Sequence, residues 1–417
     1  MHFLLKQRMG YHIIQLDNGI RVVLNQQASN ITHTCLIVNV GSRDEEAGKF
    51  GMAHFIEHLL FKQTARRNTN QILNRLESVG GDLNAYTTKE YTCIHASVLR
   101  PYLSRALDLF EDITFHSTFP EVEMTKEKGV ILDEMASYLD SPEESIMDDF
   151  DDLLFAGTGL GHNILGLETD LQSITQQDVK DFIARNYTAE DIAIGISGDY
   201  TPKEIERLVN KIFTAPLRPS REKSLASPAL FAPKHEIVYK PINQVHYALG
   251  VPAYGIHDSR KTTLMLLNNM LGGIGMSSIL NLSVREKYGI AYTIESSYAM
   301  YEDTGIFSIY LGTDEEKIKR ATRLVRKELD KLIVKPISES VLNKAKHKFK
   351  GQIALAEENR MSVIIAETKN ILDYNKIITL EDVFQKIDAV TADKVHEIAA
   401  ELFAAERMSS LAFAPED

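Results

Sequence analysis

Cysteine is almost absent from this sequence of 417 residues, which contains only Cys35 and Cys93. Both lie in apolar, β-branched stretches, so a disulfide framework and a cysteine-based zinc site are excluded, and two buried thiols are expected. No stretch approaches the roughly 20 consecutive apolar residues that a membrane span needs. Residues 1–10 do not have the pattern of a signal peptide. We therefore expect a cytoplasmic protein with no membrane partner.

Long basic runs are also missing, and the formal net charge is −12, from 46 Lys and Arg against 58 Asp and Glu. A protein of this sign repels nucleic acids and anionic membranes, so neither is expected as a partner. Hydrophobic residues make up 44% of the chain and charged residues 25%, which is typical of a soluble globular protein. The length predicts two to four domains.

Residues 50–61 form the most informative stretch, Phe-Gly-Met-Ala-His-Phe-Ile-Glu-His-Leu-Leu-Phe. In a helix, His54 and His58 lie one turn apart on one face, with Glu57 beside them. Two imidazoles in this arrangement can bind one metal ion, and H-x-x-E-H reverses the H-E-x-x-H zinc signature. The plain alternative is two surface histidines, but chance produces such a match in only a few of roughly a hundred chains.

Catalytic zinc takes three protein ligands and leaves one position open, so a third ligand must come from elsewhere in the chain. Glu127 and Glu134, on a helix predicted over residues 121–138, are the best candidates. They are seven residues apart and share one face of the helix, but they lie about 10 Å apart along its axis. Both carboxylates cannot reach one ion, and the spacing alone does not choose between them.

Together these residues resemble the pitrilysin and mitochondrial processing peptidase family of zinc metallopeptidases, in particular its single-chain bacterial type. Glu134 follows His58 by 76 positions (134 − 58), which matches the family's third ligand. The resemblance implies that His54, His58 and Glu134 bind one zinc ion per chain. It also implies that Glu57 is the general base and that Glu127 is an accessory carboxylate near the site.

A predicted edge strand, residues 82–87, contains the sequence Asn-Ala-Tyr-Thr. This sequence resembles the family segment that binds the substrate backbone by strand addition. The resemblance implies that the substrate contacts Asn84, Ala85, Tyr86 and Thr87. The alternative is an edge strand without a binding role.

The second half of the chain has a different pattern, a glycine-rich segment over residues 272–278 followed by Arg285 and Tyr292. It resembles the family's glycine-rich loop and its Arg/Tyr pair, which contact the substrate and the tetrahedral intermediate. Without the resemblance, a role for Arg285 as a solvated surface residue is as good an explanation as a substrate contact. The family usually has arginine where Ile279 stands and glycine where Gln63 stands, and neither difference affects a ligand.

The chain contains an internal repeat, because residues 171–179 are echoed by residues 386–395. The matching threonines, at positions 175 and 391, are 216 residues apart (391 − 175). This period is too long for a solenoid, so it indicates two copies of one domain. The copy of the metal helix, residues 262–270, contains no histidine, which confines the metal ligands to the first copy.

Four prolines between residues 216 and 233 indicate a linker that connects the two copies. We predict an N-terminal zinc-binding catalytic lobe over residues 1–214, a linker over 215–234 and a non-catalytic lobe with the Arg/Tyr pair over 235–417. A hairpin signal at residues 17–19 opens the fold, and the near-continuous apolar character of a strand at 32–40 predicts cover on both of its faces. The α+β fold class is what the resemblance implies. The resemblance implies two homologous lobes, each a mainly antiparallel sheet backed by helices.

The resemblance implies a zinc metalloendopeptidase that hydrolyses flexible peptides in a closed chamber, which two chains form as a clamshell. Glu57 acts as base on a water that zinc activates, and Tyr292 donates to the oxyanion. A homodimer suffices, because one chain carries both the metal motif and the Arg/Tyr pair. One alternative is a non-catalytic partner subunit of a processing-peptidase-like complex. Another is a peptide-binding scaffold whose metal is structural.

Overall fold

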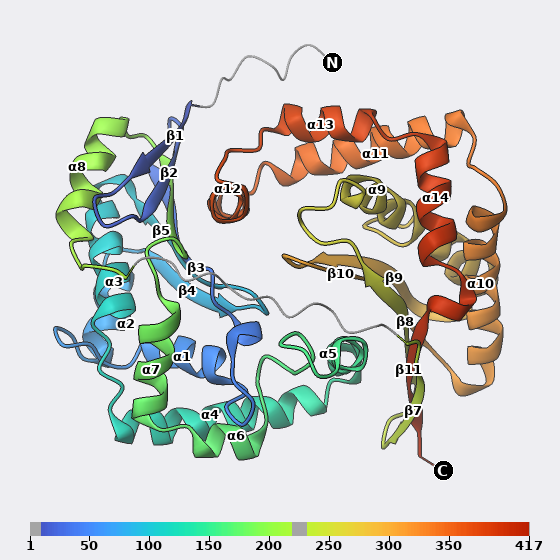
Figure 1. The fold of residues 1–417 in the computed structure, drawn as a ribbon, viewed down its shortest axis with the longest axis horizontal. Coiled ribbons are helices and arrows are strands. Elements are labelled where there is room, and N and C mark those ends of the chain that lie inside the picture. The colour runs from blue at the N-terminus through green and yellow to red at the C-terminus, as the bar shows by residue number, and fades with distance from the viewer. Residues whose placement is uncertain (1–9, 219–231, 417) are drawn as a thin grey trace. The chain divides into compact units, whose positions relative to one another are not determined.

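The structure, a computed structural model, describes residues 10–218 and 232–416. Residues 1–9, on which the prediction about a signal peptide rests, and most of the predicted linker lie outside the described residues. The chain divides into two compact units, each built on one sheet (Figure 1). Within the described ranges, no helix is both long enough and apolar enough to span a bilayer.

The sheet of the first unit has six strands in the order β1-β2-β6-β3-β5-β4. Only β2 and β6 pair in parallel, and every other pair is antiparallel. The predicted hairpin is confirmed, with Gly19 in its turn at a φ of 95°, a conformation that suits glycine. The strands are β1 (Gly10–Gln15), β2 (Arg21–Gln26), β3 (Ile31–Val38), β4 (Asp82–Thr87), β5 (Thr92–Leu99) and β6 (Ile192–Gly198).

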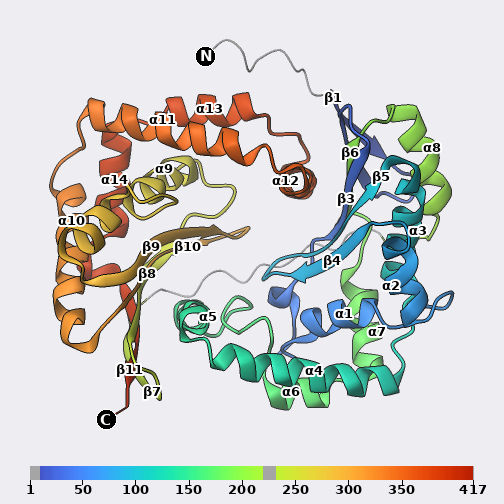
Figure 2. The same ribbon diagram turned by 180° about the vertical axis from the view of Figure 1, so that it is seen from behind.

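Helices cover both faces of this sheet. Successive side chains of a strand point to opposite faces, so each strand contributes to two cores. On β3, Leu36 and Val38 face one core, whereas Cys35 and Ile37 face another. The first core also takes residues from α1 (Met52–Leu60), α2 (Thr69–Glu77), α3 (Leu103–Phe115), α4 (Glu121–Leu139), α6 (Glu168–Ser173), α7 (Gln176–Asn186) and α8 (Pro202–Ile212). The second is covered by α12 (Arg360–Tyr374) (Figure 2). The apolar run at 32–40 predicted this two-sided cover.

Helix α12 comes from the second half of the sequence but belongs to the first unit. Its Ile364 and Ile371 pack on Val23 of β2. The helix lies so close to β6 that a Cβ on Gly195 would stand 2.1 Å from the Thr368 hydroxyl oxygen. Glycine is therefore required at this position. Both cysteines are buried and unpaired on this face of the sheet, as expected.

The second unit has a five-stranded sheet in the order β7-β11-β8-β10-β9. Its strands are β7 (His235–Lys240), β8 (Val245–Ala253), β9 (Ala291–Met300), β10 (Gly305–Thr313) and β11 (Ser409–Pro415). One face packs on α9 (Lys261–Leu271), α10 (Ile318–Val334) and α14 (Ala392–Leu402). The other packs on α5 (Pro142–Phe155), a helix from the first half of the sequence. The remaining helices are α11 (Glu339–Ala356) and α13 (Leu380–Asp388).

The two sheets repeat one topology. The pairs β2–β6 and β7–β11 are parallel, and three antiparallel strands follow in the same order in each unit. Thr175 and Thr391, the threonines matched in sequence, are both helix N-caps, of α7 and α14. The α+β fold with two homologous sheets backed by helices is therefore confirmed. The two compact units do not coincide with the two halves of the sequence on either side of the linker. The first unit includes α12 from the second half, and the second unit includes α5 from the first half.

Candidate metal centre

Helix α1 holds the H-x-x-E-H motif at the edge of the first unit's core. Phe55, Ile56 and Leu59 are buried in that core, so the opposite face carries the polar side chains. The Glu45 carboxylate accepts hydrogen bonds of 2.8 Å from the first free N–H groups of the helix, those of Gly51 and Ala53. These bonds satisfy donors that have no partner within the helix, so the first turn and its histidine are held firmly.

Three side chains converge on one point beside this helix. His54, His58 and Glu134 each place a donor atom within 4.8 Å of the others. Glu134 Oε2 lies 3.8 Å from His54 Nε2 and 3.6 Å from His58 Nε2. Ligands of tetrahedral zinc, with bonds near 2.0–2.1 Å, lie roughly 3.3 Å apart, so shifts of a few tenths of an ångström bring Glu134 Oε2 to that separation from each histidine nitrogen. No other such group of three occurs in the described part of the chain.

The protonation state of His54 also suits a cation. Burial, with a smaller contribution from His58, lowers the pKa of His54 to about 4. At neutral pH the ring is therefore uncharged, so a cation can bind it without displacing a second proton from the imidazole. Its Nδ1 is buried and has no hydrogen-bond partner among the described residues.

Glu127 lies next to the ligand group but outside it. Its Oε2 is 3.2 Å from His58 Nδ1, and its Oε1 is 2.6 Å from Lys62 Nζ. The His58 ring thus has Glu127 at one nitrogen and Glu134 at the other. A carboxylate in this outer position fixes the orientation of a ligand imidazole. Lys62 was not singled out from the sequence; it lies two residues beyond the end of α1, so helical spacing alone does not place it beside Glu127.

Glu57 also stands outside the ligand group of His54, His58 and Glu134. Burial raises its pKa, while a hydrogen bond from Thr87 acts in the opposite direction. The Thr87 hydroxyl donates to Glu57 Oε2 at 2.7 Å. The resemblance placed Thr87 in the substrate strand, and this contact with Glu57 was not anticipated.

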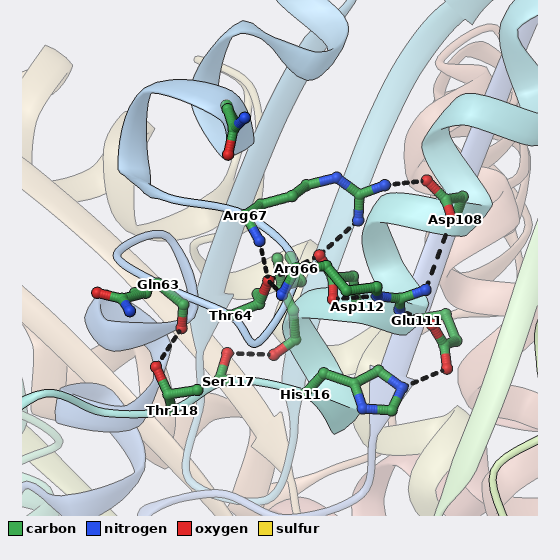
Figure 3. Close-up of polar contacts among 12 residues, drawn as sticks. Gln63, Thr64, Arg66, Arg67, Asp108, Glu111, Asp112, His116, Ser117 and Thr118 are labelled. Atoms are coloured by element: carbon green, nitrogen blue, oxygen red, sulfur yellow. Dashed lines mark hydrogen bonds and ion pairs between the residues drawn. The ribbon is translucent and has the colours of Figure 1, made fainter.

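The loop that follows α1 is tied to α3 by a network of ion pairs (Figure 3). Asp112, which is completely buried, accepts hydrogen bonds from Thr64 Oγ1 at 2.9 Å and Arg66 Nε at 2.7 Å. It also accepts from Arg67. Burial raises the pKa of Asp112, but the bonds from these residues outweigh it and hold the pKa below its ordinary value. The network fixes the segment that carries Lys62.

Replacing Asp112 by asparagine is expected to lower the free energy of unfolding by about 3 kcal/mol, because two arginines lose a buried counter-charge. The folded carboxyl has the lower pKa, so its contribution is complete above the ordinary value of 3.8 and is lost as the pH falls through the folded value. Urea unfolding of both proteins across pH measures this. Asp181→Asn, on an exposed residue, is the control, and a pH-independent difference would contradict the assignment.

Arg285 and Tyr292 belong to the second unit. They line a cavity of about 710 Å³, together with the glycine-rich segment from Gly272 to Gly275 and the edge strand β9. Tyr292 is 52% exposed and donates to Asp314 Oδ1 at 2.9 Å. The structure therefore groups the second-half residues in one cavity, while the three donor residues, Glu57, Glu127 and β4 lie in the first unit.

Comparison with known proteins matches both halves of the chain. Residues 21–167 match the family model described as Insulinase (Peptidase family M16), and residues 173–349 match the Peptidase M16 inactive domain. The Bacillus subtilis protein named uncharacterized zinc protease YmxG is 32% identical over 388 residues, which cover 93% of this chain and 94% of that protein. This chain belongs to peptidase family M16. A zinc protease of Rickettsia bellii, also named uncharacterized, is 30% identical over 96% of this chain and 97% of its own.

Solved structures have the same M16 fold. A protease from Helicobacter pylori matches with a TM-score of 0.89 at 22% identity, over 97% of this chain and 99% of that chain. A Pseudomonas fluorescens protein, described as a peptidase M16 inactive domain, matches with a TM-score of 0.88 at 21% identity, over 98% of both chains. The H-x-x-E-H motif lies in the part that matches the first M16 model, and Arg285 and Tyr292 lie in the part that matches the inactive domain.

Proposed function

We propose that this M16 chain is a zinc-dependent endopeptidase that hydrolyses flexible peptides. The observation that carries the proposal is the grouping of three donor atoms, from His54, His58 and Glu134, beside a carboxylate that stays outside the group. Three protein ligands leave a coordination position open, as catalytic zinc requires. When bound, zinc supplies Lewis acidity, which makes water a stronger acid and polarises a carbonyl.

Side chains of the protein carry out the other steps of peptide hydrolysis. Glu57 Oε1 takes the proton of the attacking water and passes it to the leaving amine. Glu127, held by Lys62, keeps the His58 ring in place. In the second unit, Arg285 contacts the substrate and Tyr292 donates a hydrogen bond to the developing oxyanion.

The substrate binds as an added strand along the free edge of β4, which supports a preference for flexible peptides over folded proteins. Ala85 N–H donates to the side-chain oxygen of Asn84 at 2.8 Å. In our proposal, a carbonyl group of the bound peptide replaces the Asn84 side chain as the acceptor of this N–H. We place the reaction in a chamber closed by two chains. Measuring the metal content of the purified protein together with its cleavage of a mixed peptide library tests the function, and a metal-free or inactive protein overturns it.

We further propose a cytoplasmic homodimer that binds one zinc ion per chain, in which each site takes Tyr292 from the partner. The two free cysteines support the reducing compartment. Refolding Glu57→Gln and Tyr292→Phe chains together gives roughly half mixed dimers, each with one intact site of two, so about a quarter of wild-type activity returns. Mixed dimers that are verified by mass and no more active than the separate variants contradict the shared site.

A further inference from the structure

Strand β4 ends at Thr87, where the sheet edge and the metal helix come together. Thr87 faces the same side of the sheet as Leu83 and Ala85, which pack against the core that contains α1. On that side its hydroxyl donates to Glu57 Oε2 at 2.7 Å. Thr87 occupies one acceptor position of Oε2, whereas it leaves both acceptor positions of Oε1 open to a water molecule.

The backbone of Thr87 faces a different direction from its side chain. Thr88 N–H donates to Tyr91 O at 2.8 Å across the β4–β5 hairpin, so residues at even positions of β4 face β5. In an antiparallel pair the alternate residues face away from the partner. The backbone N–H and C=O groups of Ala85 and Thr87 therefore point to the free edge, in agreement with the bond from Ala85 N–H to the Asn84 side chain.

We infer that Thr87 is a positioning residue that connects the substrate strand to the general base. Its backbone sets the register of a peptide added to β4, and its hydroxyl fixes the carboxylate of Glu57 relative to that register. The inference rests on the proposed function of Glu57 and extends it to a residue outside the metal motif. A base held by the binding strand itself stays aligned with the bond to be cleaved, because both depend on one residue.

Valine is the sharpest replacement, since it keeps the shape and β-branching of threonine and removes only the hydroxyl. Losing a hydrogen bond to a charged group that must be oriented for reaction is expected to lower kcat roughly ten- to a hundredfold. The backbone edge is unchanged, so KM and the dissociation constant of a peptide for the metal-free protein stay at wild-type values. Zinc affinity is also unchanged, because Thr87 contacts no metal ligand. Thr87→Ser, which keeps the donor, restores kcat.

Thr92→Val is the matched control. Thr92 is the cross-strand partner of Thr87 and donates to Val40 O at 3.0 Å. The same substitution there removes a buried hydroxyl from the neighbouring strand without touching Glu57. It is expected to leave kcat near the wild-type value.

The experiment compares kcat, KM, zinc affinity and peptide binding for wild type, Thr87→Val, Thr87→Ser and Thr92→Val. A selective loss of kcat in Thr87→Val, restored by serine, supports the inference. Three results overturn it: wild-type kcat in Thr87→Val, weaker peptide binding as its main defect, or an equal loss in Thr92→Val. A zinc-loaded wild-type protein that cleaves no peptide overturns the proposed function instead, so the two failures are distinguishable.

Discussion

Glu57→Gln is expected to abolish peptide hydrolysis while the protein keeps its zinc. Glutamine has nearly the same shape but cannot accept the proton of the attacking water, and loss of a general base lowers kcat by roughly a hundred- to ten-thousandfold. The zinc stays because Glu57 is outside the group formed by His54, His58 and Glu134. Metal analysis and turnover of a peptide substrate measure the two effects on one sample.

Stability helps to interpret this variant. Burial raises the pKa of Glu57, so the folded protein disfavours the charged carboxylate, and a neutral glutamine is expected not to lower the melting temperature. A stable, zinc-containing and inactive protein therefore identifies a chemical defect. The control is Glu123→Gln, which removes a carboxylate that pairs with Lys126 on the surface of α4. Full activity in Glu57→Gln rules out its role as the base.

His58→Ala is expected to lose the metal itself. Its ring nitrogens lie 3.6 Å from Glu134 and 3.2 Å from Glu127, so its removal takes away one of three ligands and the contact that links the outer carboxylate to the site. Two remaining ligands do not make a catalytic zinc site. We expect less than about a tenth of one zinc per chain after dialysis, and no turnover.

His116→Ala provides the comparison for this loss. His116 also pairs with a carboxylate, with Nε2 2.8 Å from Glu111 Oε1, but it lies outside the ligand group. This variant is expected to keep one zinc ion and its activity. Stoichiometric zinc in His58→Ala would show that the metal binds elsewhere, whereas its loss in both variants would indicate a general effect on the fold.

The features of this molecule that could be predicted from the sequence are those that depend on local residue patterns. The helical period places His54 and His58 on one face, and the near-continuous apolar run over β3 predicts a sheet covered on both sides. The repeat, with threonines that cap equivalent helices, predicts two sheets of one topology. These features depend on residues a few positions apart, or on two segments that resemble each other.

The sequence by itself therefore determined the elements, the repeated α+β fold and the motif in α1. Only the tertiary structure decided which distant residues meet: Glu127 contacts His58 across 69 positions, and Thr87 contacts Glu57 across 30. It also decided that α12 and α5 each cover the sheet of the other half of the sequence. The physical reason is that propensity and periodicity act within one element, whereas these contacts depend on how separate elements pack. A helix with an apolar face, such as α12, can satisfy that face on either sheet, and the close approach that Gly195 allows is a property of the packed pair.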